Sequence, residues 1–169
     1  MFLDETGAKT NMTRRYARAR KGQRAVDYAP HGHWNTTTLI AGLTQGAPIA
    51  PMVLDGPMDA DAFEAYVGQA LIPALPTAAI VVMDNLSSHK APAIARLFEA
   101  AQVEVWYLPP YSPDFNPIEQ MWSKVKSYLR SAKPRTLQEL YDAIAAALAQ
   151  ISAGDAEGFF RDCVVGIKC

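Results

Sequence analysis

Ala79–Asp84 reads AIVVMD, an unbroken apolar run that ends in an aspartate. A continuous run of this length is typical of a central strand in a parallel sheet, where both faces of the strand are covered. In open α/β folds, the residues that follow such strands lie at the carboxyl edge of the sheet, where ligands bind. The segment therefore predicts an α/β fold and makes Asp84 a candidate site residue.

The sequence on both sides of this run alternates between strand and helix patterns. Met1–Asp4 reads as the end of a buried strand, and Thr136 opens a T-x-x-E capping box. The expected strands are Trp34–Leu43, Ile49–Leu54 and Val103–Leu108, and the expected helices are Asp59–Ala74, Pro92–Ala101, one from Pro117, one from Thr136, and Glu157–Val165. This order predicts a mixed central sheet flanked by helices, with extra helices at the C-terminal end. We expect Trp34, Trp106 and Trp122 in the core.

The composition fits one globular domain. The chain has 169 residues, of which 50% are hydrophobic and 20% are charged, so a sizeable core is possible and disorder is not expected. We therefore treat residues 1–169 as a single domain. No apolar run approaches the ~20 residues of a membrane helix, no secretion signal is present, and Cys163 and Cys169 form no disulfide framework. These features favour a reduced, cytoplasmic setting without a membrane.

The net charge of −1 hides an uneven distribution of charge. Seven cations and no acid lie between Lys9 and Arg24, and five cations and no acid lie between Lys124 and Arg135. Asp27–His89, by contrast, contains six acids and no Lys or Arg. Patches of this kind can bind a polyanion in spite of a neutral sum. The cations that we expect to contact DNA, with an ordinary solvated loop or helix face as the alternative, are Arg14, Arg15, Arg18, Arg20, Lys21, Lys124, Lys126 and Arg130.

Three carboxylates form the candidate catalytic site. Asp4 and Asp84 each end a hydrophobic strand, and Glu119 lies in the first turn of the helix from Pro117. If the two strands are parallel neighbours, the three side chains meet at one sheet edge, where oxygen ligands suit Mg²⁺ or Mn²⁺. Two such ions about 4 Å apart can cleave a phosphodiester. The simpler alternative is that each acid is a polar strand end or, for Glu119, a capping partner of Asn116.

Three motifs together are similar to those of a known enzyme family. They are LDET at Leu3–Thr6, MDNLSSHK at Met83–Lys90 and LPPYSPDFNPIEQMWSKVK at Leu108–Lys126. This set resembles the DDE transposases of the mariner superfamily, most of all the bacterial branch of the insertion sequence 630 group. Thirty-four residues separate Asp84 from Glu119, which is the spacing typical of that branch. The resemblance extends from residue 1 to about residue 135, and its most specific part is YSPDFNPIE.

The resemblance implies a fold, a cofactor and a reaction. The fold would be ribonuclease-H-like, and Asp4, Asp84 and Glu119 would bind two Mg²⁺ ions, for which Mn²⁺ can substitute. Asp4 would bridge both ions, and the other two acids would each hold one. The reaction would be cleavage of DNA at transposon ends, followed by attack of the freed 3′-hydroxyl on target DNA, at TA dinucleotides in relatives of this kind. The partners would be DNA and a second copy of the chain in a dimer or synaptic complex, in a bacterial cytoplasm and on its nucleoid.

Other residues of the same motifs are expected to support the site. Asn85 and His89 match the D-N-x-x-x-H pattern of the family and would hold the loop after the strand or touch substrate, with a purely structural cap as the alternative. Asn116 would cap the following helix and, with Tyr111, shape the turn before the catalytic glutamate. Glu5 points to the opposite face of its strand from the aspartate before it, so it should not bind the same metal.

Two other functions are compatible with these residues. One is a ribonuclease-H-like nuclease that hydrolyses DNA without strand transfer. The other is a non-catalytic remnant that binds DNA or a full-length transposase through its basic stretches. Complete transposases of this type carry an N-terminal helix-turn-helix region that recognises the element's ends, and residues 1–169 do not supply it. We expect it either on a polypeptide from an upstream frame, joined by frameshifting, or lost by truncation.

Overall fold

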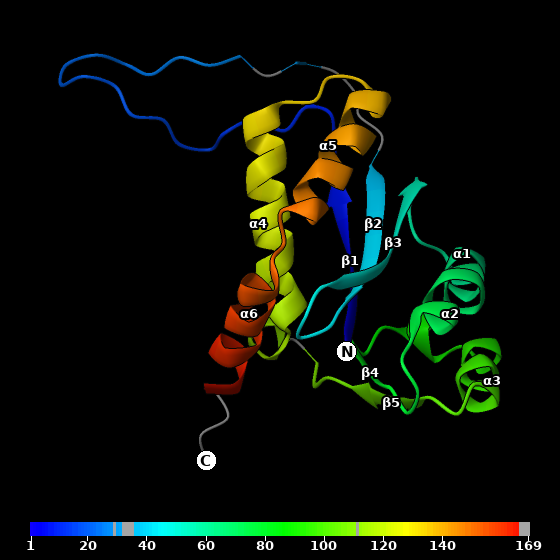
Figure 1. Ribbon diagram of the computed structural model, residues 1–169. Coiled ribbons are helices and arrows are strands. Elements are labelled where there is room, and N and C mark those ends of the chain that lie inside the picture. The colour runs from blue at the N-terminus through cyan, green and yellow to red at the C-terminus, as the bar shows by residue number, and fades with distance from the viewer. Residues whose placement is uncertain (29, 32–35, 111, 166–169) are drawn as a thin grey trace.

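A five-stranded mixed sheet forms the centre of the computed structural model, which describes residues 1–28, 30–31, 36–110 and 112–165 (Figure 1). Its strands are β1 (Phe2–Ala8), β2 (Thr37–Leu43), β3 (Pro48–Asp55), β4 (Ile80–Met83) and β5 (Glu104–Tyr107). They lie in the order β3-β2-β1-β4-β5. β2 pairs antiparallel with both β1 and β3, whereas β4 pairs parallel with both β1 and β5. The expected core residue Trp34, the turn residue Tyr111 and Cys169 lie outside the described residues.

Two groups of helices cover the two faces of this sheet (Figure 1). The helices are α1 (Ala60–Tyr66), α2 (Ile72–Ala74), α3 (Pro92–Ala100), α4 (Pro117–Ala132), α5 (Leu137–Ala149) and α6 (Ala153–Val165). α4, α5 and α6 form one layer, and α1, α2 and α3 form the other. The predicted α/β class, with a mixed sheet flanked by helices and extra C-terminal helices, is therefore confirmed.

The alternation of side chains along β2 gives each layer its own core, because successive residues of a strand point to opposite faces. Leu39 and Ala41 pack with the α4 layer, around the buried Trp122. Ile40, between them, packs with the α1 layer against Phe63. Every residue of β2 is buried, as expected for a strand that is covered on both faces. Within the described residues, no helix is both long and apolar enough to cross a membrane.

β1 differs from its prediction, because Asp4 is inside the strand and not at its end. β1 continues to Ala8, and each of its residues from Phe2 to Ala8 pairs with β2. The antiparallel ladder with β2 keeps the chain extended beyond the apolar residues. The polar sequence after Leu3 therefore does not mark the end of the strand.

Three further boundaries or environments differ from expectation. α6 begins at Ala153 rather than Glu157, because Ser152 and Asp155 exchange side-chain to backbone hydrogen bonds of 2.9 and 3.1 Å that cap an earlier turn. Trp106 is 53% exposed and not in the core, because β5 is an edge strand with one uncovered face. The helix expected over Asp59–Ala74 is present but contains a π-helical turn between α1 and α2.

Candidate active site

The register between β1 and β4 brings Asp4 and Asp84 together. Phe2 pairs with Val82 in the parallel ladder, so two residues further along each strand Asp4 lies beside Asp84. β4 ends at Met83, and Asp84 therefore stands at its carboxyl edge. The expected meeting of the two aspartates occurs, although β1 itself does not end there.

The start of α4 places Glu119 at the same edge. α4 packs against β1, so its first turn lies over the strand that carries Asp4. Pro117 occupies the first turn of α4, where its missing N–H costs little. The Glu119 amide donates a 3.1 Å hydrogen bond to the Asn116 carbonyl, which begins the helix. The Glu119 side chain is exposed, whereas Asp4 is only 9% exposed.

A cleft of about 400 Å³ joins these elements. It is lined by Asp4, Asp84, Asn85, Leu86, Leu108, Pro109, Pro110, Ser112, Pro113, Asn116 and Glu119. The three predicted acids and both predicted asparagines thus share one cleft. No Lys or Arg is among the described residues that line it, so the acids face one another without a nearby cation from the walls.

The environment of Asp4 disfavours its negative charge. Burial and, next in size, the negative charge of Glu119 raise the pKa of Asp4 to about 7. Glu5 and Asp84 add smaller repulsions, while the Glu5 amide, which donates a 2.8 Å hydrogen bond to Asp4 Oδ1, acts in the opposite direction. A positive ion in this cleft would relieve the repulsion among these carboxylates.

Asp84 has the opposite balance. Burial opposes its ionisation, but the contact with His89 and the Leu86 amide outweigh burial and hold the pKa of Asp84 below its ordinary value. His89 Nδ1 lies 2.7 Å from Asp84 Oδ1, and its Nε2 lies 3.3 Å from Glu5 Oε2. Burial alone lowers the pKa of His89, but these two carboxylates outweigh it and raise the pKa to about 9.

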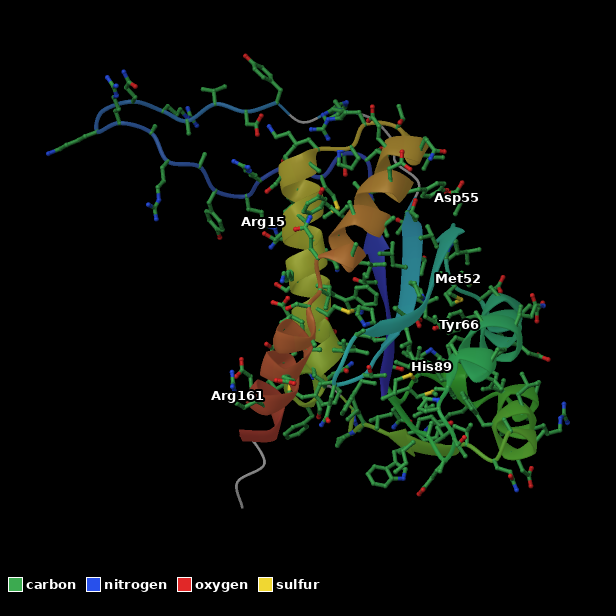
Figure 2. The ribbon with its side chains drawn as sticks, viewed as in Figure 1. Arg15, Met52, Asp55, Tyr66, His89 and Arg161 are labelled. Atoms are coloured by element: carbon green, nitrogen blue, oxygen red, sulfur yellow. The ribbon has the colours of Figure 1, made fainter. Side chains whose placement is uncertain are left out.

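His89 therefore contacts Asp84 and does not line the open cleft. Glu5, which contacts His89, is a residue near the site that the sequence analysis did not identify. Strand alternation correctly predicts that Glu5 faces away from Asp4. What the sequence lacks is a signal that the short helical turn Ser87–Lys90 would fold back and bring His89 to Glu5. Figure 2 shows His89 on the opposite side of the sheet from Arg15, and its ring stacks on Phe63 of α1.

Asn116 occupies the position that was predicted but does not act as predicted. It is the N-cap residue of α4, yet its side chain makes no capping hydrogen bond. The residue is only 5% exposed, and its Oδ1 has no hydrogen-bond partner among the described residues. Instead, the Asn116 amide lines the cleft that holds the three acids. The prediction of a side-chain cap is therefore wrong, because Oδ1 accepts no hydrogen bond from the amides of the first turn of α4.

Among the described residues, no three His, Cys, Asp or Glu side chains are gathered closely enough to form a metal centre as they stand. The donor set of the cleft is nevertheless of one chemical type. Asp4, Asp84 and Glu119 offer only carboxylate oxygens, the ligands that Mg²⁺ and Mn²⁺ prefer. Their mutual repulsion and the absence of a cation among the described lining residues fit the binding of divalent ions.

The two cation-rich stretches of the sequence meet at the C-terminal end of α4. Residues 9–28, here called the basic arm, form a long loop that projects from the body of the protein (Figure 1). The Arg14 guanidinium donates a 3.4 Å hydrogen bond to Ser131, and Lys133 pairs with Asp27 at 2.6 Å. Arg135 donates to the Thr10 carbonyl at 2.8 Å. These bonds hold the base of the arm on the end of α4.

Arg15 and Arg130 lie close enough to repel each other. Burial lowers the pKa of Arg130, and the charge of Arg15 lowers it further. Figure 2 shows Arg15 beside the C-terminal half of α4, where Arg130 is located. Two neighbouring guanidinium groups of this kind suit an anion such as a phosphate.

Lys124, in contrast, has a partner within the protein. Its Nζ lies 2.6 Å from Asp155 Oδ2 and donates a 3.2 Å hydrogen bond to the Gln150 carbonyl. These contacts tie α4 to the start of α6. Lys124 is therefore part of helix packing, and the structure does not favour it as a DNA contact.

Comparisons with known proteins bear directly on this arrangement. The sequence model of a family described as DDE superfamily endonuclease matches residues 1–141. The Transposable element Tcb2 transposase of Caenorhabditis briggsae is 24% identical over 115 residues, in an alignment that covers 65% of this chain and 42% of that protein. This chain thus spans less than half of that relative.

Several solved structures of the Mos1 transposase have a similar fold. The Mos1 Strand Transfer Complex superposes with a TM-score of 0.76 at 21% identity and covers 98% of this chain and 53% of that chain. The Mos1 mariner paired end complex with Mn gives a TM-score of 0.77 at 20% identity, with 98% and 54% covered. The catalytic domain of Mos1 mariner transposase gives 0.65 at 15% identity, with 96% and 75% covered. These likenesses establish that the fold is that of the Mos1 catalytic domain.

Proposed function

Since the chain belongs to the DDE superfamily endonuclease family, we propose that residues 1–169 are the catalytic domain of a transposase, which cuts DNA at transposon ends and joins them to target DNA. The observation that carries this proposal is the single cleft that contains Asp4, Asp84 and Glu119. The three acids come from β1, the end of β4 and the first turn of α4, in the order that the resemblance implied.

We propose that these three carboxylates hold two Mg²⁺ ions, for which Mn²⁺ can substitute. Their oxygen-only donor set and their mutual repulsion support this assignment. Such ions, when bound, activate the attacking hydroxyl and stabilise the leaving oxygen of a phosphodiester. The chain itself contributes the placement of its ligands: Asp4 is fixed in a strand, and Glu119 is fixed at a helix start. Asn85 and Asn116 line the same cleft and are positioned to contact substrate.

We propose that the basic arm and the C-terminal half of α4 bind the phosphate backbone. The cations assigned to this contact are Arg14, Arg15, Arg18, Arg20, Lys21, Lys126 and Arg130, without Lys124. Support comes from the convergence of the two cation-rich stretches and from the close approach of Arg15 to Arg130. Phosphate contacts of this kind position DNA without reading its sequence.

We further propose that the chain acts as a dimer in a synaptic complex of paired transposon ends and inserts at TA dinucleotides of bacterial nucleoid DNA. The support is the likeness in fold to the Mos1 paired end and strand transfer complexes, together with the motifs of the insertion sequence 630 group.

The decisive experiment replaces one acid of the cleft at a time. We expect Asp84→Asn and Glu119→Gln each to abolish Mn²⁺-dependent nicking of plasmid DNA, because each removes a metal ligand, while DNA binding in a gel-shift assay is retained. Asp61→Asn, on the exposed surface of α1, is the control for loss of one carboxylate and should nick normally. Undiminished nicking by either cleft variant would refute the assignment.

Addition of a DNA duplex with a free 3′-hydroxyl to the nicking assay separates the alternative functions. A transposase joins this duplex to the plasmid, whereas a nuclease without strand transfer only nicks the plasmid. A chain that binds DNA with no metal-dependent activity is the non-catalytic remnant. The full set of cleft acids and the fixed position of Asp4 favour a catalytic domain over the remnant.

A further inference from the structure

We propose that Glu5 and His89 are positioning residues that fix the Asp84 carboxylate for metal binding, with Glu5 acting through His89. This inference rests on the proposed function, because it takes Asp84 as a metal ligand. Its basis is an uninterrupted set of side-chain contacts, from Glu5 through the imidazole of His89 to Asp84, at 3.3 and 2.7 Å.

His89 is held rigidly at the middle of this set. Its side chain is only 1% exposed, and its ring stacks on Phe63 with the centroids 4.3 Å apart and the planes at 27°. Its backbone N–H donates a 3.2 Å hydrogen bond to the Leu86 carbonyl, and its carbonyl accepts a 3.4 Å hydrogen bond from the Tyr107 hydroxyl. The imidazole therefore has little freedom to follow Asp84 if that carboxylate moves.

Asp84 needs such support more than Asp4 does. It follows the last residue of β4, its side chain is 38% exposed, and the bond from the Leu86 amide is 3.2 Å long. Asp4, in contrast, is buried within a paired strand. The shorter contact to His89 is what limits rotation of the Asp84 carboxylate, so the other face of that carboxylate is presented to the cleft.

Glu5 completes the set from the far side of β1. Because it alternates with Asp4 along the strand, it reaches the α1 layer, where its Oε2 is buried against His89. Its carboxylate lines a different cleft, of about 640 Å³, together with Asp55. The ring nitrogens of His89 meet both carboxylates as ion pairs that fall short of aligned hydrogen bonds. Removal of the Glu5 charge therefore removes one of the two polar contacts that place the ring against Asp84.

Carboxylates that hold a metal ligand from behind commonly contribute 10–100-fold to metal affinity or activity. We expect His89→Asn to weaken Mn²⁺ binding by about 10–100-fold and Glu5→Gln to weaken it in the same direction by a smaller factor. Because Glu5 acts through His89, the double variant should bind Mn²⁺ no more weakly than His89→Asn alone. Binding is measured without DNA, from the electron paramagnetic resonance signal of free Mn²⁺ in a titration.

Matched controls separate positioning from general effects of charge and folding. Asp55→Asn removes one carboxylate from the same cleft as Glu5 and should bind Mn²⁺ like the wild type. Thermal unfolding of each variant reports its folding. Should His89→Asn fail to fold, Glu5→Gln still decides the question, because its side chain is isosteric and lies partly exposed.

Two outcomes would overturn the inference alone: Mn²⁺ affinity of the wild-type value in Glu5→Gln, or losses in the single variants that multiply in the double variant. A site that requires Asp84 but is indifferent to Glu5 leaves the proposed function standing. Mn²⁺ binding that is absent in the wild type, or unchanged in Asp84→Asn, overturns the proposed function and this inference together.

Discussion

Asp4 and Asp84 lie side by side in the sheet, yet their surroundings favour opposite states of charge. Asp84 receives an imidazole and a backbone amide, which hold its pKa below the ordinary value. Asp4 receives one amide, is more deeply buried and faces Glu119, so its pKa rises to about 7. The two aspartates thus differ in pKa, because only Asp84 is followed by a turn that supplies positive charge.

Another acid, Asp155, leads to a prediction about stability at low pH. The Lys124 ammonium and the Ser152 hydroxyl donate to its Oδ2 at 2.6 and 2.7 Å, and these contacts hold the pKa of Asp155 well below its ordinary value of 3.8. A carboxylate with a lowered pKa in the folded state stabilises the fold above its unfolded pKa and loses this contribution as the pH falls through the folded pKa. We expect Asp155→Asn to lower Tm at neutral pH, and the deficit to shrink below about pH 4.

Thermal unfolding of the wild type and Asp155→Asn at several pH values between about 3 and 7 measures this deficit. Asp142→Asn is the matched control, since Asp142 accepts a hydrogen bond from Gln138 on the same helix rather than pairing with a cation. Its Tm should differ little from that of the wild type at any of these pH values. A deficit in Asp155→Asn that stays constant or grows on acidification would contradict the prediction.

Residue-level prediction from the sequence succeeded where a strand or helix boundary fixes a side chain. Asp84 and Glu119 could be placed because an apolar run ends before one and a proline opens the helix of the other. Glu5 could not be identified as a partner of His89, because that contact depends on how the turn after β4 packs on α1, which local periodicity does not encode. The absence of a side-chain cap at Asn116 could not be predicted for a similar reason, because capping geometry depends on backbone angles that local periodicity does not encode.

At the scale of elements, the N-cap residues of α4 and α5 differ in their side-chain bonds. Their replacement by alanine should therefore lower the free energy of unfolding by different amounts. Thr136 makes a complete capping box, with its Oγ1 accepting from the Glu139 amide at 3.2 Å and its own amide donating to Glu139 Oε2 at 3.1 Å. Asn116 makes no side-chain cap. We expect Thr136→Ala to lower the free energy of unfolding by about 1 kcal/mol, the usual value of a lost N-cap.

Asn116→Ala is the counterpart of this substitution at the start of α4. It removes no capping bond and relieves a buried amide oxygen that has no partner in the described residues. We therefore expect a change in unfolding free energy within about 0.5 kcal/mol, as measured by urea unfolding of both variants. A loss in Asn116→Ala that equals or exceeds the loss in Thr136→Ala would show that the amide makes a stabilising bond after all.

The two strands that differ from prediction, β1 and β5, share one cause, which is the presence or absence of a neighbouring strand from a distant part of the chain. β1 extends beyond its apolar residues because β2 supplies a full ladder, and Trp106 is exposed because β5 has no neighbour on its outer side. By contrast, α4 and α5 follow their periodicity closely, since their buried residues recur at helical spacing along the chain. Helix patterns are local, whereas the ends and edges of strands are set by partners.

At the scale of the whole molecule, α4 connects the catalytic cleft to the basic surface. Glu119 lies in its first turn and Arg130 in its last, and eleven residues of helix span about 16 Å. Duplex DNA rises about 3.4 Å per base pair, so DNA lying along α4 in the proposed complex would place a phosphate at Arg130 and Arg15 about five base pairs from the cleft. A net charge of −1 is thus compatible with DNA binding, because the cations gather at one end of a rigid helix and the acids at the other.

The basic arm predicts how DNA affinity depends on salt. Arg18, Arg20 and Lys21 are exposed along the projecting part of the arm. Each cation that neutralises a phosphate adds about 0.9 to the slope of log affinity against log salt concentration. Replacing these three residues by Gln should therefore flatten the slope by as much as about 2.7 and weaken binding at low salt.

Arg96→Gln, on α3 in the other helical layer, is the control and should leave the slope unchanged. Arg18, Arg20 and Lys21 belong to neither core, so the triple variant should melt like the wild type. An unchanged slope in the triple variant, measured by fluorescence anisotropy over a series of salt concentrations, would remove the arm from the DNA-binding surface and leave α4 as its remaining part.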